Sequence, residues 1–250
     1  MAQSTNPPPR LAVFFLGGIT MNGRSIADRR ITMTLAGLIA LASMIVVLAV
    51  SGTGESHAAG ARAHRAAVPA RTSKAIAFHD EMRALWEAHG SWTHMVIVSF
   101  VGNLPDLAAE EQVLLGNQVD IGNAVKPYYG RAAGNKLTKL LKEHILGAVN
   151  VLVAAKSGDK NKLAQAEAAW YANGRQIADF LHAADPGFLS RAAARTMMKV
   201  HLDQVIGQAV DELKGNYTAG ARAFAPYIRH ILDMADMISG GIIEQFPGRF

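Results

Sequence analysis

The chain has 250 residues, of which 50% are hydrophobic and 18% charged, and its formal net charge is +5. It contains no cysteine, which excludes disulfides, thiolate metal sites and cysteine nucleophiles. Residues 1–74 hold eight of the 25 Lys and Arg residues but only two of the 20 Asp and Glu residues. The rest of the chain therefore carries a net charge of −1, and we predict no nucleic-acid partner for it.

The first predicted element is an uncharged apolar run at residues 31–50, which is preceded by Arg24, Arg29 and Arg30. A helix of this length is just long enough to cross a bilayer, and the positive-inside rule places residues 1–30 in the cytoplasm and the rest outside. The run could equally be the core of a signal peptide cleaved before Ala59. Twin-arginine export and a buried core helix are further alternatives. We therefore expect a protein that is anchored in the membrane and faces outward, or one that is secreted.

Residues 51–73 are rich in Ala, Gly, Ser and Arg and lack apolar periodicity, which predicts a flexible linker. Residues 74–250 form the predicted folded domain. Apolar residues recur there at helical spacing, and no stretch alternates with the period of a strand. We therefore predict an all-α bundle of about six helices, the second of which ends or kinks at Pro127. The helices are expected at about residues 75–101, 105–127, 134–155, 160–183, 189–213 and 219–245.

The six predicted helices resemble a set of three that is repeated. The string WEAHG at residues 86–90 is similar to WYANG at residues 170–174, an offset of 84. The string HIL at residues 144–146 recurs at residues 230–232, an offset of 86. These matches favour two duplicated three-helix halves that pack about a pseudo-twofold axis, where polar residues of both halves could meet.

Two histidines lie on the apolar stripes of predicted helices. His89 shares a helical face with Trp86, and His144 lies within the most regular apolar pattern of the chain. An unpaired buried polar group costs about 1–3 kcal/mol, so each histidine must be hydrogen-bonded, metal-bound or next to a cavity. We predict that both are buried and approach one another or a polar cluster with Asn117. Both should be mostly neutral at pH 7 unless a carboxylate such as Asp120 faces them.

Helical bundles also build metal and cofactor sites from polar side chains on facing helices. The cofactor that such an arrangement suggests is a divalent metal ion, and its candidate ligands are His89, Asn117, Asp120, His144 and His230. No Glu-x-x-His, His-x-x-x-His or His-Glu-x-x-His motif supports them. Hydrogen-bonded core histidines packed by tryptophan are therefore the leading interpretation, and a metal or small-ligand site is the alternative. No catalytic residue is predicted, because the sequence has neither a phosphate-binding glycine loop nor a nucleophile elbow.

Three strings carry a resemblance to a known family: WEAHGSWT at residues 86–93, NQVDIGNAVKPYYG at residues 117–130 and LLKEHIL at residues 140–146. They resemble a family of uncharacterised bacterial helical proteins, over roughly residues 75–185. Its members often carry the names glycosyltransferase or acetylglutamate kinase, and both of those activities require an α/β fold that this sequence does not predict.

We therefore expect a non-enzymatic, extracytoplasmic binding or interaction module, whose small ligand or protein partner the sequence does not identify. A metal- or cofactor-binding bundle is the alternative, and a transferase comes third.

Overall fold

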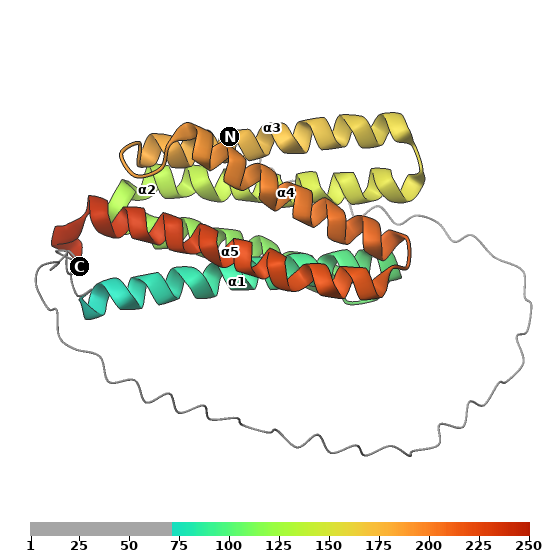
Figure 1. The fold of residues 1–250 in the computed structure, drawn as a ribbon, viewed down its shortest axis with the longest axis horizontal. Helices are drawn as coiled ribbons and strands as arrows, with labels where there is room; N and C mark the ends of the chain where they lie inside the picture. Colours follow the sequence, from blue (N-terminus) through green and yellow to red (C-terminus); the bar gives the residue numbers. More distant parts are fainter. Residues whose placement is uncertain (1–71) are drawn as a thin grey trace, which may run out of the picture. The chain divides into compact units, whose positions relative to one another are not determined.

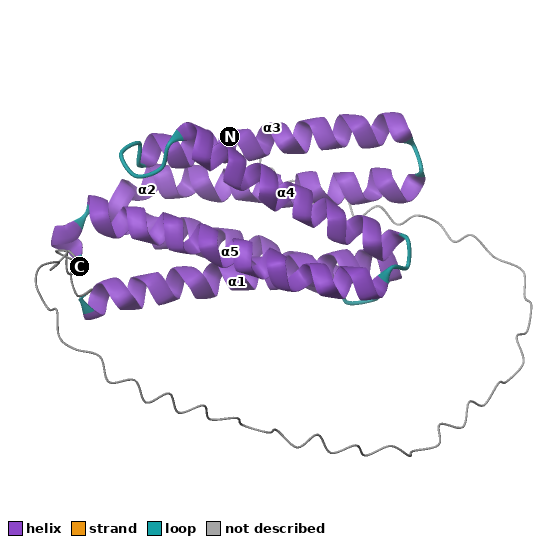
Figure 2. Cartoon of the chain, viewed as in Figure 1, coloured by secondary structure: helices purple, strands orange, loops and turns teal. Residues whose placement is uncertain are grey.

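A computed structural model describes residues 72–250 of the chain. This part contains no strand and is built from α1 (Ser73–Gly102), α2 (Leu107–Ser157), α3 (Lys160–Ala184), α4 (Arg191–Leu213), α5 (Tyr217–Gln245) and the short 3-10 helix η1 (Pro247–Arg249), as Figures 1 and 2 show. The all-α prediction is confirmed for these residues. The predicted cytoplasmic segment, the membrane or signal helix and all but the end of the linker lie outside them. From residue 72 onward, none of the helices combines the length and the apolarity that a membrane span needs.

The structure has five α-helices rather than six because two of the predicted helices are joined in α2. Gly130 interrupts α2 with a φ of 83° and a ψ of 168°, a conformation that glycine adopts readily and other residues avoid. A Cβ atom on Gly122 would lie 2.7 Å from the carbonyl oxygen of Gly134, whereas twelve residues of straight helix span about 18 Å. Helix α2 therefore folds back on itself at Gly130 (Figure 1). We call residues 107–129 its first arm and residues 131–157 its second arm.

The helices form a closed arrangement in which the last packs against the first. α1 packs against α2 and α5, α3 packs against α2 and α4, and α4 also contacts α5 and α1. Two contacts tie the ends of this fold together. Arg83 donates two hydrogen bonds from its Nη1 to Asp236, at 2.6 and 2.7 Å, which joins α1 to α5. The ring of Phe78 lies 5.3 Å from that of Phe250, centroid to centroid, so the start of α1 lies beside the C-terminus.

Several helices begin at a short polar residue, in the segments where the sequence predicts breaks between helices. The Thr72 side chain accepts a hydrogen bond from the Ala75 amide, and that of Ser190 accepts one from the Ala193 amide. Both bonds satisfy amides that have no partner within the helix. The loops before α3, α4 and α5 lie at the predicted turns, so the ends of most helices agree closely with the predictions.

A main apolar core runs through the bundle, and a smaller apolar cluster of Val96, Leu114 and Ile145 is separate from it. The main core includes residues that are at most 3% exposed from every long helix: Met82, Trp86, Ile121, Trp170, Ile177, Leu202, Tyr227 and Ile231. Several polar side chains are buried within the same core, and burial of polar groups requires compensation by hydrogen bonds or ligands. These residues define the candidate site.

Candidate functional site

Three histidines from three helices meet in the core. His89 on α1, His144 on the second arm of α2 and His201 on α4 are 2%, 3% and 2% exposed. The ring of His201 lies 5.8 Å from that of His89 and 5.7 Å from that of His144, measured between centroids. We call these three residues the histidine cluster. His89 and His144 are both buried, as the sequence predicted, and His201 connects them.

A hydrogen bond between Nδ1 and the Asn173 side chain fixes the ring of His144. Its Nδ1 lies 2.8 Å from Oδ1 of Asn173, while Nδ2 of Asn173 donates to the Leu140 carbonyl at 3.1 Å. Because the Asn173 amide nitrogen is the donor to Leu140, its oxygen must accept from His144, so Nδ1 of His144 carries the proton. The neutral ring then has its lone pair on Nε2. The indole of Trp170 stacks on the ring and donates to the His144 carbonyl at 2.9 Å.

Each histidine of the cluster has one buried ring nitrogen without a hydrogen-bond partner among the described residues: Nδ1 of His89, Nε2 of His144 and Nδ1 of His201. The Gln118 side chain lies close enough to His89 to oppose part of the fall in the pKa of that histidine, although its buried Oε1 meets full hydrogen-bond geometry with no group of the described chain. The amide of Gln118 donates instead to the Leu114 carbonyl at 2.7 Å. Most buried side-chain polar atoms in proteins are satisfied, so this concentration of unpaired nitrogens is unusual.

Burial keeps the three rings neutral at physiological pH. It lowers the pKa of His89 to about 3, and the charge of the nearby His144 adds to this effect. It lowers the pKa of His144 to about 4, which the hydrogen bond to Asn173 partly opposes. Burial, followed by the other histidines, also lowers the pKa of His201 well below its ordinary value. A neutral imidazole keeps one ring nitrogen free to accept a proton or bind a metal ion.

The remaining candidate ligands from the sequence lie elsewhere or are already engaged. Asn117 is buried, but its amide donates to the Leu85 carbonyl at 2.9 Å and its oxygen accepts from Gln118 at 3.1 Å. The structure places Asp120 on the exposed face of α2, so it does not reach the core. His230 is half-buried, and its Nε2 lies 3.0 Å from the Met197 carbonyl.

The described part of the chain holds no group of three or more His, Asp or Glu side chains whose geometry is that of a metal site. The unpaired nitrogens of the histidine cluster therefore do not converge on one point. An ion could be bound only if the rings turned. The torsion that turns a histidine ring is broad, but turning His144 would break its hydrogen bond to Asn173, so His89 and His201 are the rings that would have to turn.

Comparison with known proteins gives no further assignment: the chain matches no family model, no curated protein and no solved structure.

Proposed function

We propose that this protein is a non-enzymatic binding module, held outside the cytoplasm by residues 31–50 or secreted after their removal, whose core binds a divalent transition-metal ion. The ligands are His89, His144 and His201. The observation that carries this proposal is the presence of one unpaired, buried ring nitrogen on each of three adjacent neutral histidines. Zinc, copper, nickel and cobalt ions bind imidazole nitrogen, whereas calcium and magnesium prefer oxygen.

The energetics favour a bound ion over three unpaired rings. Each buried polar group without a partner costs about 1–3 kcal/mol, and coordination removes that cost for every nitrogen involved. Two imidazoles on one tetrahedral ion have ring centroids roughly 5 Å apart, given metal–nitrogen distances of about 2.0–2.1 Å. The observed centroid distances of 5.7 and 5.8 Å are within about 1 Å of that value, so binding requires mainly that the rings turn their unpaired nitrogens toward one ion.

His144 already has the environment of a metal ligand. Metal-binding histidines commonly donate their other ring N–H to an oxygen, which fixes the tautomer and raises the basicity of the ligating nitrogen. The bond from Nδ1 of His144 to Asn173 supports this role, because it leaves the lone pair on Nε2.

The test is a Co²⁺ titration of the full chain, purified without a polyhistidine tag and stripped with a chelator. We expect visible absorption bands of imidazole-bound Co²⁺ at one equivalent, displaced by Zn²⁺. His144→Gln and His201→Gln should lose them, whereas His182→Gln should keep them because His182 contacts the Leu189 carbonyl outside the cluster. If the wild type binds no ion at micromolar concentrations, or if the cluster variants bind as well as the wild type, the metal proposal fails and the cluster is structural.

We also infer that the bundle consists of two duplicated halves, α1 with both arms of α2, and α3 with α4 and α5. Six buried residues of the first arm correspond, 84 positions later, to six buried residues of α4. They are Glu110, Leu114, Asn117, Gln118, Ile121 and Val125, matched by Ala194, Met198, His201, Leu202, Val205 and Ala209. The same offset relates His89 to Asn173. Each half then supplies one histidine and one asparagine at corresponding core positions.

A further inference from the structure

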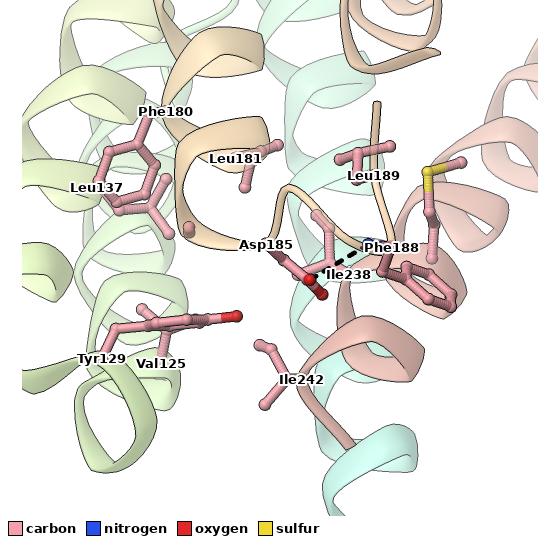
Figure 3. Close-up of a pocket in the computed structure, with 12 residues that line it drawn as sticks. Val125, Tyr129, Leu137, Phe180, Leu181, Asp185, Phe188, Leu189, Ile238 and Ile242 are labelled. Atoms are coloured by element: carbon pink, nitrogen blue, oxygen red, sulfur yellow. Dashed lines mark hydrogen bonds between the residues drawn. The ribbon is translucent and has the colours of Figure 1, made fainter. Parts of the chain in front are cut away.

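One end of the bundle holds both termini of the described chain (Figure 1). The ring of Phe78, in the second turn of α1, lies 4.9 Å from that of Tyr128, beside the turn of α2, and 5.3 Å from that of Phe250. The loop between α3 and α4 lies at the same end, because its Phe188 lines one apolar pocket with Tyr129 (Figure 3). We call this end the tether end, since residues 1–71 join the bundle here.

Aromatic side chains at the tether end are only partly covered. Phe188 is 42% exposed, and Tyr128, Tyr129, Phe246 and Phe250 are half-buried. The rings of these last four contact one another at centroid distances of 5.1 to 5.8 Å. Single exposed apolar residues are ordinary on soluble proteins, whereas these five come from three parts of the chain and meet at one end. Tyrosine is enriched where proteins contact the interface between a membrane and water.

The tether end also has a positive net charge. We define it as residues 72–76, 127–134, 181–194 and 242–250. Four basic residues of these segments outnumber two acidic ones: Lys74, Arg131, Arg191 and Arg249 against Asp185 and Glu244. The far end consists of residues 99–110, 154–163 and 210–220, which Lys156 ties together by donating to the Phe100 carbonyl at 2.8 Å. The far end has four lysines and five acidic residues, so positive charge is specific to the tether end.

The sequence that enters the tether end adds to this charge. Residues 56–79 contain Arg62, Arg65, Arg71 and Lys74 but no Asp or Glu. The uncharged run at residues 31–50 precedes them and is long enough to cross a bilayer. A linker with the composition and length of residues 51–73 spans roughly 25–30 Å on average. An anchored chain would therefore keep the tether end near the bilayer, where even a weak contact is populated.

We propose that the tether end docks on the surface of a bilayer that contains anionic lipid. The aromatic side chains would lie at the level of the headgroups, and the basic side chains would contact lipid phosphates. Interfacial binding combines buried apolar area with attraction to anionic lipid, and each basic side chain near the surface contributes about a fivefold gain. The far end would then point away from the membrane. This inference rests on the part of the proposed function that keeps residues 31–50 in the membrane, and it does not involve the histidine cluster.

The experiment follows an environment-sensitive dye on the full chain after its transfer from detergent into preformed vesicles. The chain has no cysteine, so a single introduced cysteine takes the dye. Gly187→Cys places it beside Phe188, where a side chain meets open space. Tyr217→Cys places it at the far end, where Tyr217 is 65% exposed. With phosphatidylglycerol in phosphatidylcholine vesicles, the dye at residue 187 should brighten and shift to shorter wavelength. It should change little in phosphatidylcholine alone, and the dye at residue 217 should remain water-exposed in both.

Two triple variants make the test specific. The first removes three basic side chains of the tether end, by Lys74→Gln, Arg131→Gln and Arg249→Gln. It should lower the ratio of docked to undocked protein roughly a hundredfold. The second removes three exposed lysines of the far end, by Lys160→Gln, Lys162→Gln and Lys214→Gln, and should dock like the wild type. If the first variant fails to fold, about 1 M salt on the wild type decides, because screening to about 3 Å should reverse the dye shift.

Flotation of the vesicles reports anchoring separately from docking. A chain that floats with the vesicles but whose dye at residue 187 stays water-exposed would overturn docking and leave the anchor intact. Equal responses of the two triple variants, or a dye shift that follows protein density instead of lipid charge, would overturn docking as well, the latter in favour of contact between copies. A chain that does not float would overturn the anchor in the proposed function, and docking with it.

Discussion

The ring of His144 has one nitrogen bonded to Asn173 and one buried nitrogen without a partner in the described structure. That arrangement limits what the ring can do. It can bind an ion or a proton through Nε2 without losing the bond at Nδ1. The proton, however, brings charge into an apolar core. Burial lowers the pKa values of all three histidines, and repulsion from neighbouring histidines adds to this effect at His89 and His201.

The histidine cluster should make the folded protein sensitive to acid. The pKa of His144 is about 4 when folded and about 6.5 when unfolded. Below pH 6.5 the unfolded chain therefore binds more protons than the folded one, and stability is lost as the pH falls from 6.5 towards 4. For His144 alone the loss is about 3 kcal/mol. Urea unfolding at pH 7.5, 5.5 and 4.5 measures it.

The control for this prediction is His144→Gln, which cannot titrate and should show a shallower decline over the same range. A free energy of unfolding that stays constant in the wild type between pH 7.5 and 4.5 would contradict the prediction. Metal binding would steepen the decline, because protons and the ion compete for the same nitrogens.

The sequence identifies part of this cluster and misses the rest for clear reasons. His89 and His144 can be found because each interrupts a regular apolar stripe. His201 occupies a similar position on α4 but is absent from the predicted ligands, although its correspondence with Asn117 at an offset of 84 could have indicated it. Asp120 is also among the predicted ligands, yet it is on the exposed face of the helix that carries Asn117. Which face is buried depends on packing partners that the sequence does not specify.

At the scale of secondary structure, the turn within α2 has the largest effect on the fold. The sequence predicts a break near Pro127, but the helix continues through this residue and reverses at Gly130. Proline is the more visible helix breaker, since it lacks an amide donor. A glycine forms a turn only when its backbone adopts the required φ and ψ angles, and the packing around it decides whether it does.

Two glycines of α2 provide a matched test of this turn. Gly130→Ala forces a side chain into a conformation that only glycine adopts readily, and we expect a loss of about 1–3 kcal/mol in stability. Gly116→Ala places a methyl group in open space on the first arm and should instead add about 0.4–1 kcal/mol. Chemical denaturation of both variants measures the two effects. Equal effects of the same sign would show that the turn does not depend on glycine.

At the scale of the whole molecule, the position of the bundle relative to the membrane is the main prediction. We expect residues 72–250 to lie outside the cytoplasm because basic residues precede the apolar run at residues 31–50. A reporter enzyme that is active only outside the cytoplasm, fused after Phe250, should therefore be active. Deletion of residues 1–50 should abolish that activity, and activity of a strictly cytoplasmic reporter at the same position would contradict the topology.

The contact between Phe78 and Phe250 has a consequence for chain connectivity. Because Phe78, near the start of the described chain, contacts its last residue, Phe250, the two ends lie close enough for the order of helices to be changed without moving any helix. A circular permutant that begins at residue 159, joins residue 250 to residue 72 by a short glycine–serine linker and ends at residue 158 should fold to the same bundle. Its helical content and melting temperature, measured by circular dichroism, should stay close to those of residues 72–250 in their natural order. A permutant that is largely unfolded would mean that folding depends on the original order of the two halves.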